Sequence, residues 1–207
     1  IRIKMGIGPA RMNVYTVRKI SQALADYLKE IYAARTSITS RTLRWPYVII
    51  GYDTRRNSRL FAEVAASVFA ANGIKVYLPS KEEVLSTPET SFGILSLGII
   101  AGVVITASQN SRDENGYKIY ISTSGQAPKE VLAKIKENMQ KVGSSDVKSL
   151  SFAEAKKLGL IKELHPKFSG LYRELVKRGV LNLELVRRIA PQVKIVYTAM
   201  CGAGYKQ

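Results

Sequence analysis

Two residue types that bind metals or form disulfides are almost missing from this chain of 207 residues. It contains one cysteine, Cys201, and one histidine, His165. A single cysteine excludes a disulfide within the chain and fits a reducing compartment. One histidine and one cysteine are too few for a zinc site of the usual kind. His165 precedes a proline in a predicted loop, so we interpret it as an exposed or capping residue rather than a catalytic one.

Long apolar runs are missing as well. The longest, residues 92–105, is interrupted by glycines and a serine, so no stretch predicts a membrane-spanning helix. No secretory leader is visible, and the first residue is isoleucine rather than methionine. We expect a cytoplasmic protein, with an organellar matrix as the alternative because the N-terminal third is basic. We therefore expect a chain that is either processed at its N-terminus or one part of a longer product.

Acidic residues are scarce relative to basic ones. The 32 Lys and Arg outnumber the 16 Asp and Glu, which gives a net charge of +16. Residues 1–60 alone hold 12 basic residues and 3 acidic ones. This excess predicts a polyanionic partner, such as RNA in a large complex. The alternative is a basic surface that has no fixed partner.

Strands and helices are predicted to alternate along the first 140 residues. The predicted strands are short apolar runs, and the predicted helices repeat apolar residues every three or four positions. We therefore predict an α/β fold, a three-layer αβα domain with a mixed, mostly parallel sheet, over residues 1–140. We expect strands at residues 47–52, 74–78, 102–105 and 117–121, and helices at residues 14–31, 59–71, 88–100 and 128–139.

Capping residues and loops complete this prediction. Asn13 and Ser58 are expected to cap the first two helices. Residues 1–12 are predicted to form a basic loop, and residues 35–46 a second loop. Residues 141–207 are predicted to be a helical linker followed by the start of an incomplete second αβα domain. Its elements are helices at 151–158, 167–178 and 181–189 and a strand at 193–197, which has no sheet of its own unless other chain supplies one.

The predicted strand at 102–105 stops abruptly at a polar segment. Ligands bind at the carboxyl ends of strands in such sheets, so this segment could be an anion-handling loop. On composition alone we favour the other interpretation, a polar turn between two strands. The segment and the start of the next strand offer a hydroxyl nucleophile, three amide side chains and a possible acid or base: Ser108, Gln109, Asn110, Asn115 and Lys118.

The sequences Thr-Ala-Ser-x-Asn at 106–110 and Asn-Gly-Tyr-Lys-x-Tyr at 115–120 resemble the catalytic serine loop of the α-D-phosphohexomutases, the phosphoglucomutase/phosphomannomutase family. Gly-Tyr-Asp-Thr-Arg at 51–55, Arg-Met-Asn at 11–13 and Thr-Ala-Met-Cys-Gly-Ala-Gly at 198–204 also resemble segments of that family. The likeness covers the first domain and the start of the second. It implies a serine that is phosphorylated, passes its phosphoryl group to a hexose phosphate, and takes one back from the other end of the sugar.

The resemblance also implies roles for particular residues. Ser108 would carry the phosphoryl group, and Lys118 would act as acid or base. Arg55 would either help to hold phosphate or form a salt bridge with Asp53 or another neighbour. In the family Mg²⁺ sits beside the phosphoserine, so Ser108 would touch the metal through its phosphate only. The predicted phosphate or substrate contacts are Arg2, Arg55, Thr106, Gln109, Asn110 and Asn115.

Three positions depart from the family pattern. Gln109 and Cys201 stand where the family has histidines, and Ser111 where it has proline. Glutamine cannot carry a proton at neutral pH, and serine does not stiffen a loop as proline does. Cys201 is either a reactive thiol or, as we favour, a buried or inert one. The aspartate-rich metal loop of the family does not occur, so the cofactor is Mg²⁺ or none.

These observations lead to three hypotheses. The first is the N-terminal part of a phosphohexomutase acting on a hexose phosphate, which we expect to be inactive as this truncated chain. The second is an inactive homologue recruited as a basic structural subunit of a larger, RNA-containing assembly. The third is a phosphosugar-binding module without turnover. The sequence does not specify which hexose phosphate is bound.

Overall fold

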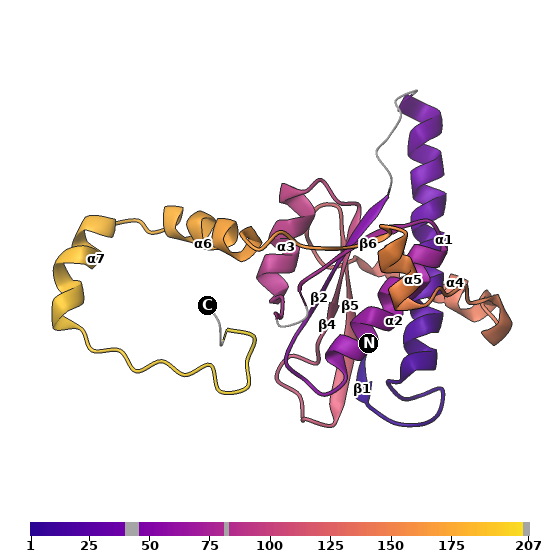
Figure 1. Ribbon diagram of the computed structural model, residues 1–207, viewed down its shortest axis with the longest axis horizontal. Helices are drawn as coiled ribbons and strands as arrows, with labels where there is room; N and C mark the ends of the chain where they lie inside the picture. Colours follow the sequence, from indigo (N-terminus) through magenta and orange to yellow (C-terminus); the bar gives the residue numbers. More distant parts are fainter. Residues whose placement is uncertain (40–45, 81–82, 205–207) are drawn as a thin grey trace.

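The computed structural model describes residues 1–39, 46–80 and 83–204 (Figure 1). The strands are β1 (Arg2–Lys4), β2 (Tyr47–Tyr52), β3 (Lys75–Leu78), β4 (Ala101–Ile105), β5 (Glu114–Ile121) and β6 (Ile161–Glu163). The helices are α1 (Val14–Thr39), α2 (Ser58–Ala71), α3 (Thr87–Ser96), α4 (Lys129–Lys141), α5 (Phe152–Lys157), α6 (Phe168–Arg178) and α7 (Leu183–Ile189).

The strands form one mixed sheet in the order β1-β5-β4-β2-β3-β6. Strands β4, β2, β3 and β6 are parallel, and β5 runs antiparallel to both β1 and β4. Tyr52 pairs with Ile105, so β2 and β4 end side by side and deliver their following loops to the same edge. The prediction of an α/β fold with a mixed, mostly parallel sheet is confirmed.

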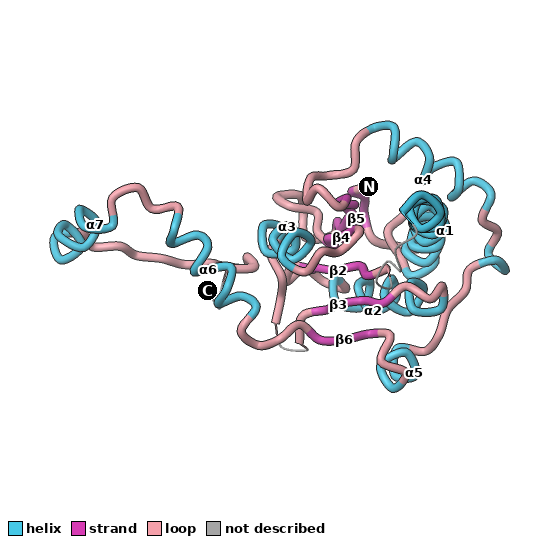
Figure 2. Tube along the Cα trace, turned by 90° about the horizontal axis from the view of Figure 1, so that it is seen from above, coloured by secondary structure: helices cyan, strands magenta, loops and turns pink. Residues whose placement is uncertain are grey.

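Both faces of the central strands β2 and β4 are buried. Val48 and Ile50 pack in one hydrophobic cluster with residues of α1 and α2, while Ile49 packs in another with Ile94 of α3. Because successive side chains of a strand point to opposite faces, this alternation places helices on both sides of the sheet. Figure 2 shows α3 on one side of the strands and α1 with α4 on the other. The predicted three-layer αβα arrangement is thus confirmed.

The two predicted helix caps have different outcomes. Asn13 caps α1 as predicted: its side-chain oxygen accepts the N–H groups of Tyr15 and Thr16, each at 3.0 Å. Ser58 does not cap α2. The N-cap is Asn57, in the left-handed region with φ 62°, and Ser58 is the first helical residue. The Ser58 hydroxyl instead donates to Asp53 Oδ1 at 2.7 Å.

Two short strands lie where none was predicted. The predicted N-terminal loop contains β1, where Arg2 pairs with Gly116, and the predicted linker contains β6, where Ile161 pairs with Val76. Part of the predicted loop at 35–46 is also helical, since α1 continues to Thr39; residues 40–45 of that loop lie outside the described residues. The helix predicted at 88–100 ends at residue 96.

The C-terminal segment has little packing of its own. Helices α6 and α7 project away from the sheet (Figures 1 and 2). The strand predicted at residues 193–197 is not formed, because no described strand pairs with it, and Val196 is 98% exposed. The predicted division into two domains at residue 140 stays a prediction. No helix among the described residues combines the length and apolar character needed to cross a membrane.

Candidate active site at the carboxyl edge of the sheet

The loop after β4, residues 106–113, presents Ser108 at the carboxyl edge of the sheet. Ser108 is exposed and has φ 60°, a left-handed conformation that costs a non-glycine residue roughly 1–2 kcal/mol. Its N–H donates to the Thr106 hydroxyl oxygen at 2.9 Å. Asn110 N–H donates to the Ala107 carbonyl oxygen at 3.2 Å and closes the turn. We refer to residues 106–113 as the serine loop.

Arg55 lies beneath the serine loop. Its Nη2 donates to the carbonyl oxygens of Ser108 and Asn110, each at 2.7 Å. Its Nη1 donates to the carbonyl oxygens of Ser111 at 2.7 Å and Glu114 at 3.2 Å. Its Nε faces Asp53 Oδ2 at 3.4 Å, so the salt bridge considered as an alternative for Arg55 is present. A direct phosphate contact by Arg55 stays a prediction.

A cavity of about 650 Å³ opens against Ser108. Gln109 and Asn110 line it, and so does Cys201 from the C-terminal segment, which is exposed rather than buried. Contacts of Gln109 and Asn110 with a phosphate or substrate stay a prediction. The Thr54 hydroxyl donates to the Cys201 carbonyl oxygen, which connects this segment to the loop after β2. The charged lining residues are three arginines and one aspartate: Arg55, Arg56, Arg112 and Asp53. The excess of positive charge suits an anion.

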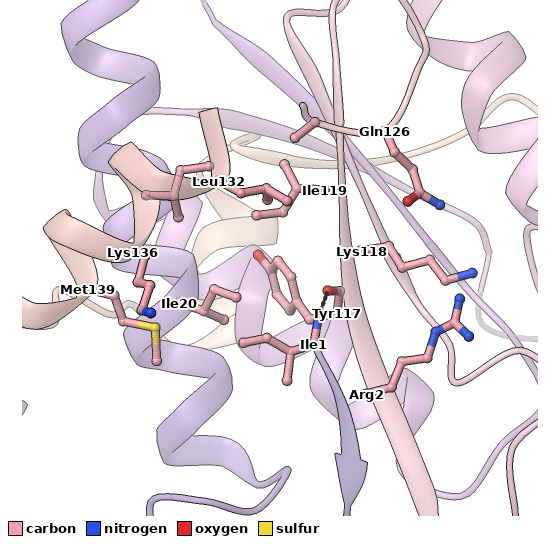
Figure 3. Close-up of a pocket in the computed structure, with 12 residues that line it drawn as sticks. Ile1, Arg2, Ile20, Tyr117, Lys118, Ile119, Gln126, Leu132, Lys136 and Met139 are labelled. Carbon is pink, nitrogen blue, oxygen red and sulfur yellow. Dashed lines mark hydrogen bonds between the residues drawn. The ribbon is translucent and has the colours of Figure 1, made fainter. Parts of the chain in front are cut away.

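Lys118 and Arg2 line a second cavity, of about 530 Å³ (Figure 3). Lys118 lies on β5 opposite Val104, and Arg2 lies on β1 opposite Gly116. Figure 3 shows their cationic groups close together on one side of the strands, with the Tyr117 ring on the other. The structure therefore groups Ser108 with Gln109, Asn110 and Arg55, and groups Lys118 with Arg2.

The environment of Lys118 changes its acidity. Partial burial lowers the pKa of the Lys118 amine, and the positive charge of Arg2 lowers it further. The Asp53 carboxylate opposes both effects. Asp53 also lines the cavity beside Ser108 and faces Arg55 there. The charge of this one carboxylate therefore acts on Arg55 at the first cavity and on Lys118 at the second.

Asn115 was predicted to contact phosphate, but the structure places it inside the protein. Its side chain is fully buried. Its Nδ2 donates to the Arg56 carbonyl oxygen at 3.1 Å and to Ser58 Oγ at 2.9 Å, and its Oδ1 accepts Gly116 N–H at 2.8 Å. With both ends of the amide engaged and no exposed surface, Asn115 fixes β5 to the start of α2 rather than offering a group to a ligand.

Sequence reasoning assigned no site role to two residues that organise this edge. Ser58 bonds both Asp53 and Asn115, and Asp53 holds Arg55. The available signal was the polar run Asp53 to Ser58 directly after a buried strand, a position where loops form ligand sites. Bonds between residues 57 positions apart, as in the Ser58–Asn115 pair, are not visible in local sequence patterns.

The described residues do not form a metal site of the usual composition. No group of three or more His, Cys, Asp or Glu side chains gathers anywhere within residues 1–39, 46–80 and 83–204. A divalent cation such as Mg²⁺ needs oxygen ligands, and the cavity beside Ser108 offers one carboxylate, already engaged with Arg55. The residues present therefore do not fit a resident Mg²⁺ on their own, and no reaction step is assigned to one.

The fold and this edge define an α/β protein whose serine loop faces a cavity with an excess of positive charge. Residues 1–146 match the model of the family described as phosphoglucomutase/phosphomannomutase, alpha/beta/alpha domain I. The chain therefore belongs to the phosphoglucomutase/phosphomannomutase family, and the part matched is its first domain.

Individual relatives agree with this family. The chain is 32% identical over 203 residues to a phosphoglucomutase of Staphylococcus saprophyticus, covering 98% of this chain and 34% of that protein. It is 37% identical over 143 residues to a phosphoglucomutase of Staphylococcus aureus strain MRSA252, covering 69% of this chain and 24% of that protein. The crystal structure of a phosphoglucomutase/phosphomannomutase family protein from Burkholderia thailandensis superposes with a TM-score of 0.56 at 16% identity, covering 95% of this chain and 35% of that one, which shows the fold. The chain spans about a third or less of these relatives.

Proposed function

We propose that this chain is the N-terminal part of a phosphohexomutase in which Ser108 carries the phosphoryl group to and from a hexose phosphate. The observation that supports this most is the presentation of Ser108. It is an exposed hydroxyl in a strained turn at the carboxyl edge of β4, facing a cavity lined by three arginines and one aspartate. Strained backbone of this kind clusters at functional sites.

The proposed step exchanges one phosphorus–oxygen bond for another. A sugar hydroxyl oxygen bonds to the phosphorus of phosphorylated Ser108 while the bond from phosphorus to Ser108 Oγ breaks. The hydroxyl proton passes to the neutral amine of Lys118. Because Lys118 and Ser108 line different cavities, the resulting ammonium returns the proton to Ser108 Oγ through solvent or the bound substrate, which leaves a serine hydroxyl. The same step in reverse, from the other phosphate of the sugar bisphosphate, restores phosphoserine. The lowered pKa of Lys118 supports this role because it increases the neutral fraction.

Charge neutralisation dominates catalysis of such steps. Among the described residues, the cations that line the two cavities and are not engaged with the serine loop include Arg56 and Arg112 at the first and Arg2 and Lys136 at the second, together with Lys118. Arg56 and Arg112 are exposed, so they can turn towards a ligand. We propose that they attract the phosphate groups, and that Gln109 and Asn110 donate hydrogen bonds to the ligand.

The test is the Ser108→Ala variant of the full-length protein, with Ser145→Ala as the matched control. Ser145 lies in the exposed turn Ser144–Asp146, away from both cavities. We expect Ser108→Ala to abolish interconversion of glucose 1-phosphate and glucose 6-phosphate and the incorporation of phosphate into the serine loop. Ser145→Ala should retain both. Turnover in Ser108→Ala equal to that of the wild type would refute the proposal.

A second candidate function rests on charge. The last described helices carry paired basic residues in exposed positions: Lys177 and Arg178 end α6, and Arg187 and Arg188 end α7. Together with the net charge of +16, this supports a basic subunit bound to RNA. The binding constant for a single-stranded RNA should then fall linearly with salt on a double-logarithmic plot. No binding at low salt would exclude this function.

A further inference from the structure

The guanidinium of Arg55 has no donor left for a ligand. An arginine carries five N–H donors in a fixed plane. Four serve the carbonyl oxygens of Ser108, Asn110, Ser111 and Glu114, and Nε faces Asp53. The side chain is also only 15% exposed. To hold a phosphate, Arg55 would have to give up a bond to the serine loop.

The serine loop in turn needs Arg55. Its internal hydrogen bonds restrain N–H groups: Ser108 to Thr106, Asn110 to Ala107, and Glu114 to Ser111. The carbonyl groups at Ser108 and Asn110 are held from outside, by Arg55. A residue in the left-handed region persists only when its surroundings fix it. By holding the Ser108 carbonyl, Arg55 fixes the backbone on which the Ser108 hydroxyl is displayed.

We propose that Arg55 is a positioning residue that acts on Ser108 through the backbone of the serine loop, and that it does not bind phosphate. This inference rests on the proposed role of Ser108. Asp53 is the anchor of Arg55, because Asp53 Oδ1 also accepts Arg55 N–H at 3.0 Å and the Ser58 hydroxyl at 2.7 Å. The fully buried Asn115 holds Ser58. A continuous set of polar contacts thus runs from β5 to the reactive serine.

The first test measures the loop itself. Arg55→Lys keeps the positive charge but replaces a planar fork with a point charge that has three donors. Arg59→Lys is the matched control, because Arg59 is also partly buried and bonds the Tyr52 hydroxyl and Glu63, away from the serine loop. In hydrogen exchange of the full-length protein, we expect amides of residues 106–114 to exchange about 100-fold faster in Arg55→Lys, since at least two charge-assisted bonds are lost. They should be unchanged in Arg59→Lys.

The second test separates positioning from binding. Arg55→Lys should lower kcat and the rate of Ser108 phosphorylation about 100-fold, while the Kd for glucose 6-phosphate stays within about twofold of the wild type. In Arg55→Ala, added guanidinium ion at millimolar concentration should partly restore both loop protection and phosphorylation. A raised Kd with normal loop exchange would show that Arg55 binds phosphate and would overturn the inference.

The two proposals can fail separately. If the wild-type protein never carries phosphate on Ser108, the proposed function fails. The exchange experiment still decides the role of Arg55 in that case. Unchanged exchange of residues 106–114 in Arg55→Lys would overturn the positioning role whatever the activity.

Discussion

Gly116 is a position at which one added methyl group should disturb the site. A Cβ built on Gly116 would lie 2.5 Å from the Thr106 carbonyl oxygen and 2.6 Å from the Ile1 carbonyl oxygen. Both contacts are shorter than real Cβ atoms make, and both oxygens belong to backbone that cannot rotate aside. Gly116→Ala must therefore push β5 away from β1 and from the first residue of the serine loop.

The cost can be estimated from this geometry. Overpacking a tightly packed site costs about 1–3 kcal/mol. The displacement also weakens the hydrogen bond from Thr106 N–H to the Gly116 carbonyl oxygen, now 3.0 Å long, which contributes about 1 kcal/mol. We expect Gly116→Ala to lower the free energy of unfolding by about 3 kcal/mol. Urea denaturation followed by circular dichroism measures this directly.

Gly125→Ala is the matched control, because Gly125 lies just beyond the other end of β5. There a Cβ would meet only Thr123 Oγ1, at 3.8 Å, an ordinary van der Waals contact. This variant should stay within about 0.5 kcal/mol of the wild type, as exposed substitutions usually do. If Gly116→Ala were as stable as Gly125→Ala, the close approach of β5 and the serine loop would be wrong.

Two further predictions concern the same strand. Asn115→Ala leaves its three buried or partly buried polar partners without the bonds it made, so it should lower the free energy of unfolding by about 3 kcal/mol in the same urea assay; a loss below about 0.5 kcal/mol would contradict its structural role. Because the pKa of Lys118 is lowered, we expect kcat/KM to rise with pH at values below the usual pKa of lysine. Arg2→Gln should shift this rise to higher pH, because it removes a positive charge that lowers the pKa of Lys118. The same shift affects stability. The free energy of unfolding rises as pH increases from the lowered pKa of Lys118 in the folded state towards its usual pKa in the unfolded state, and it falls as pH decreases through this range. An unchanged pH dependence of kcat/KM in Arg2→Gln would contradict the effect of Arg2 on the pKa of Lys118.

The long, periodic elements of this fold were predictable from the sequence. Strand β2 and helix α2 lie within one residue of their predicted bounds, because a buried apolar run and a three-to-four-residue repeat are local signals. Strands β1 and β6 were missed because each has three residues and exists through pairing with a distant strand. The strand predicted at 193–197 failed for the opposite reason: it has the apolar residues but no described partner.

The candidate site was predictable in part. The serine loop and its place at the end of β4 follow from an apolar run that stops at small polar residues. The roles of Asn115 and Arg55 do not follow, because the burial of Asn115 and the four carbonyl contacts of Arg55 depend on segments more than 50 residues apart. The Asn57 cap was missed because serine is a common capping residue. In the structure the Ser58 hydroxyl instead bonds Asp53 and accepts from the distant Asn115, a contact that the local sequence does not reveal.

The central claim is that Ser108 carries a phosphoryl group. The most direct measurement is the intact mass of the protein purified from its native source, followed by mapping of any phosphate by peptide mass spectrometry. The proposed function predicts one phosphoryl group on Ser108, which incubation with hexose phosphate removes or exchanges. An unphosphorylated serine loop that gains no phosphate from glucose 1,6-bisphosphate would contradict the claim.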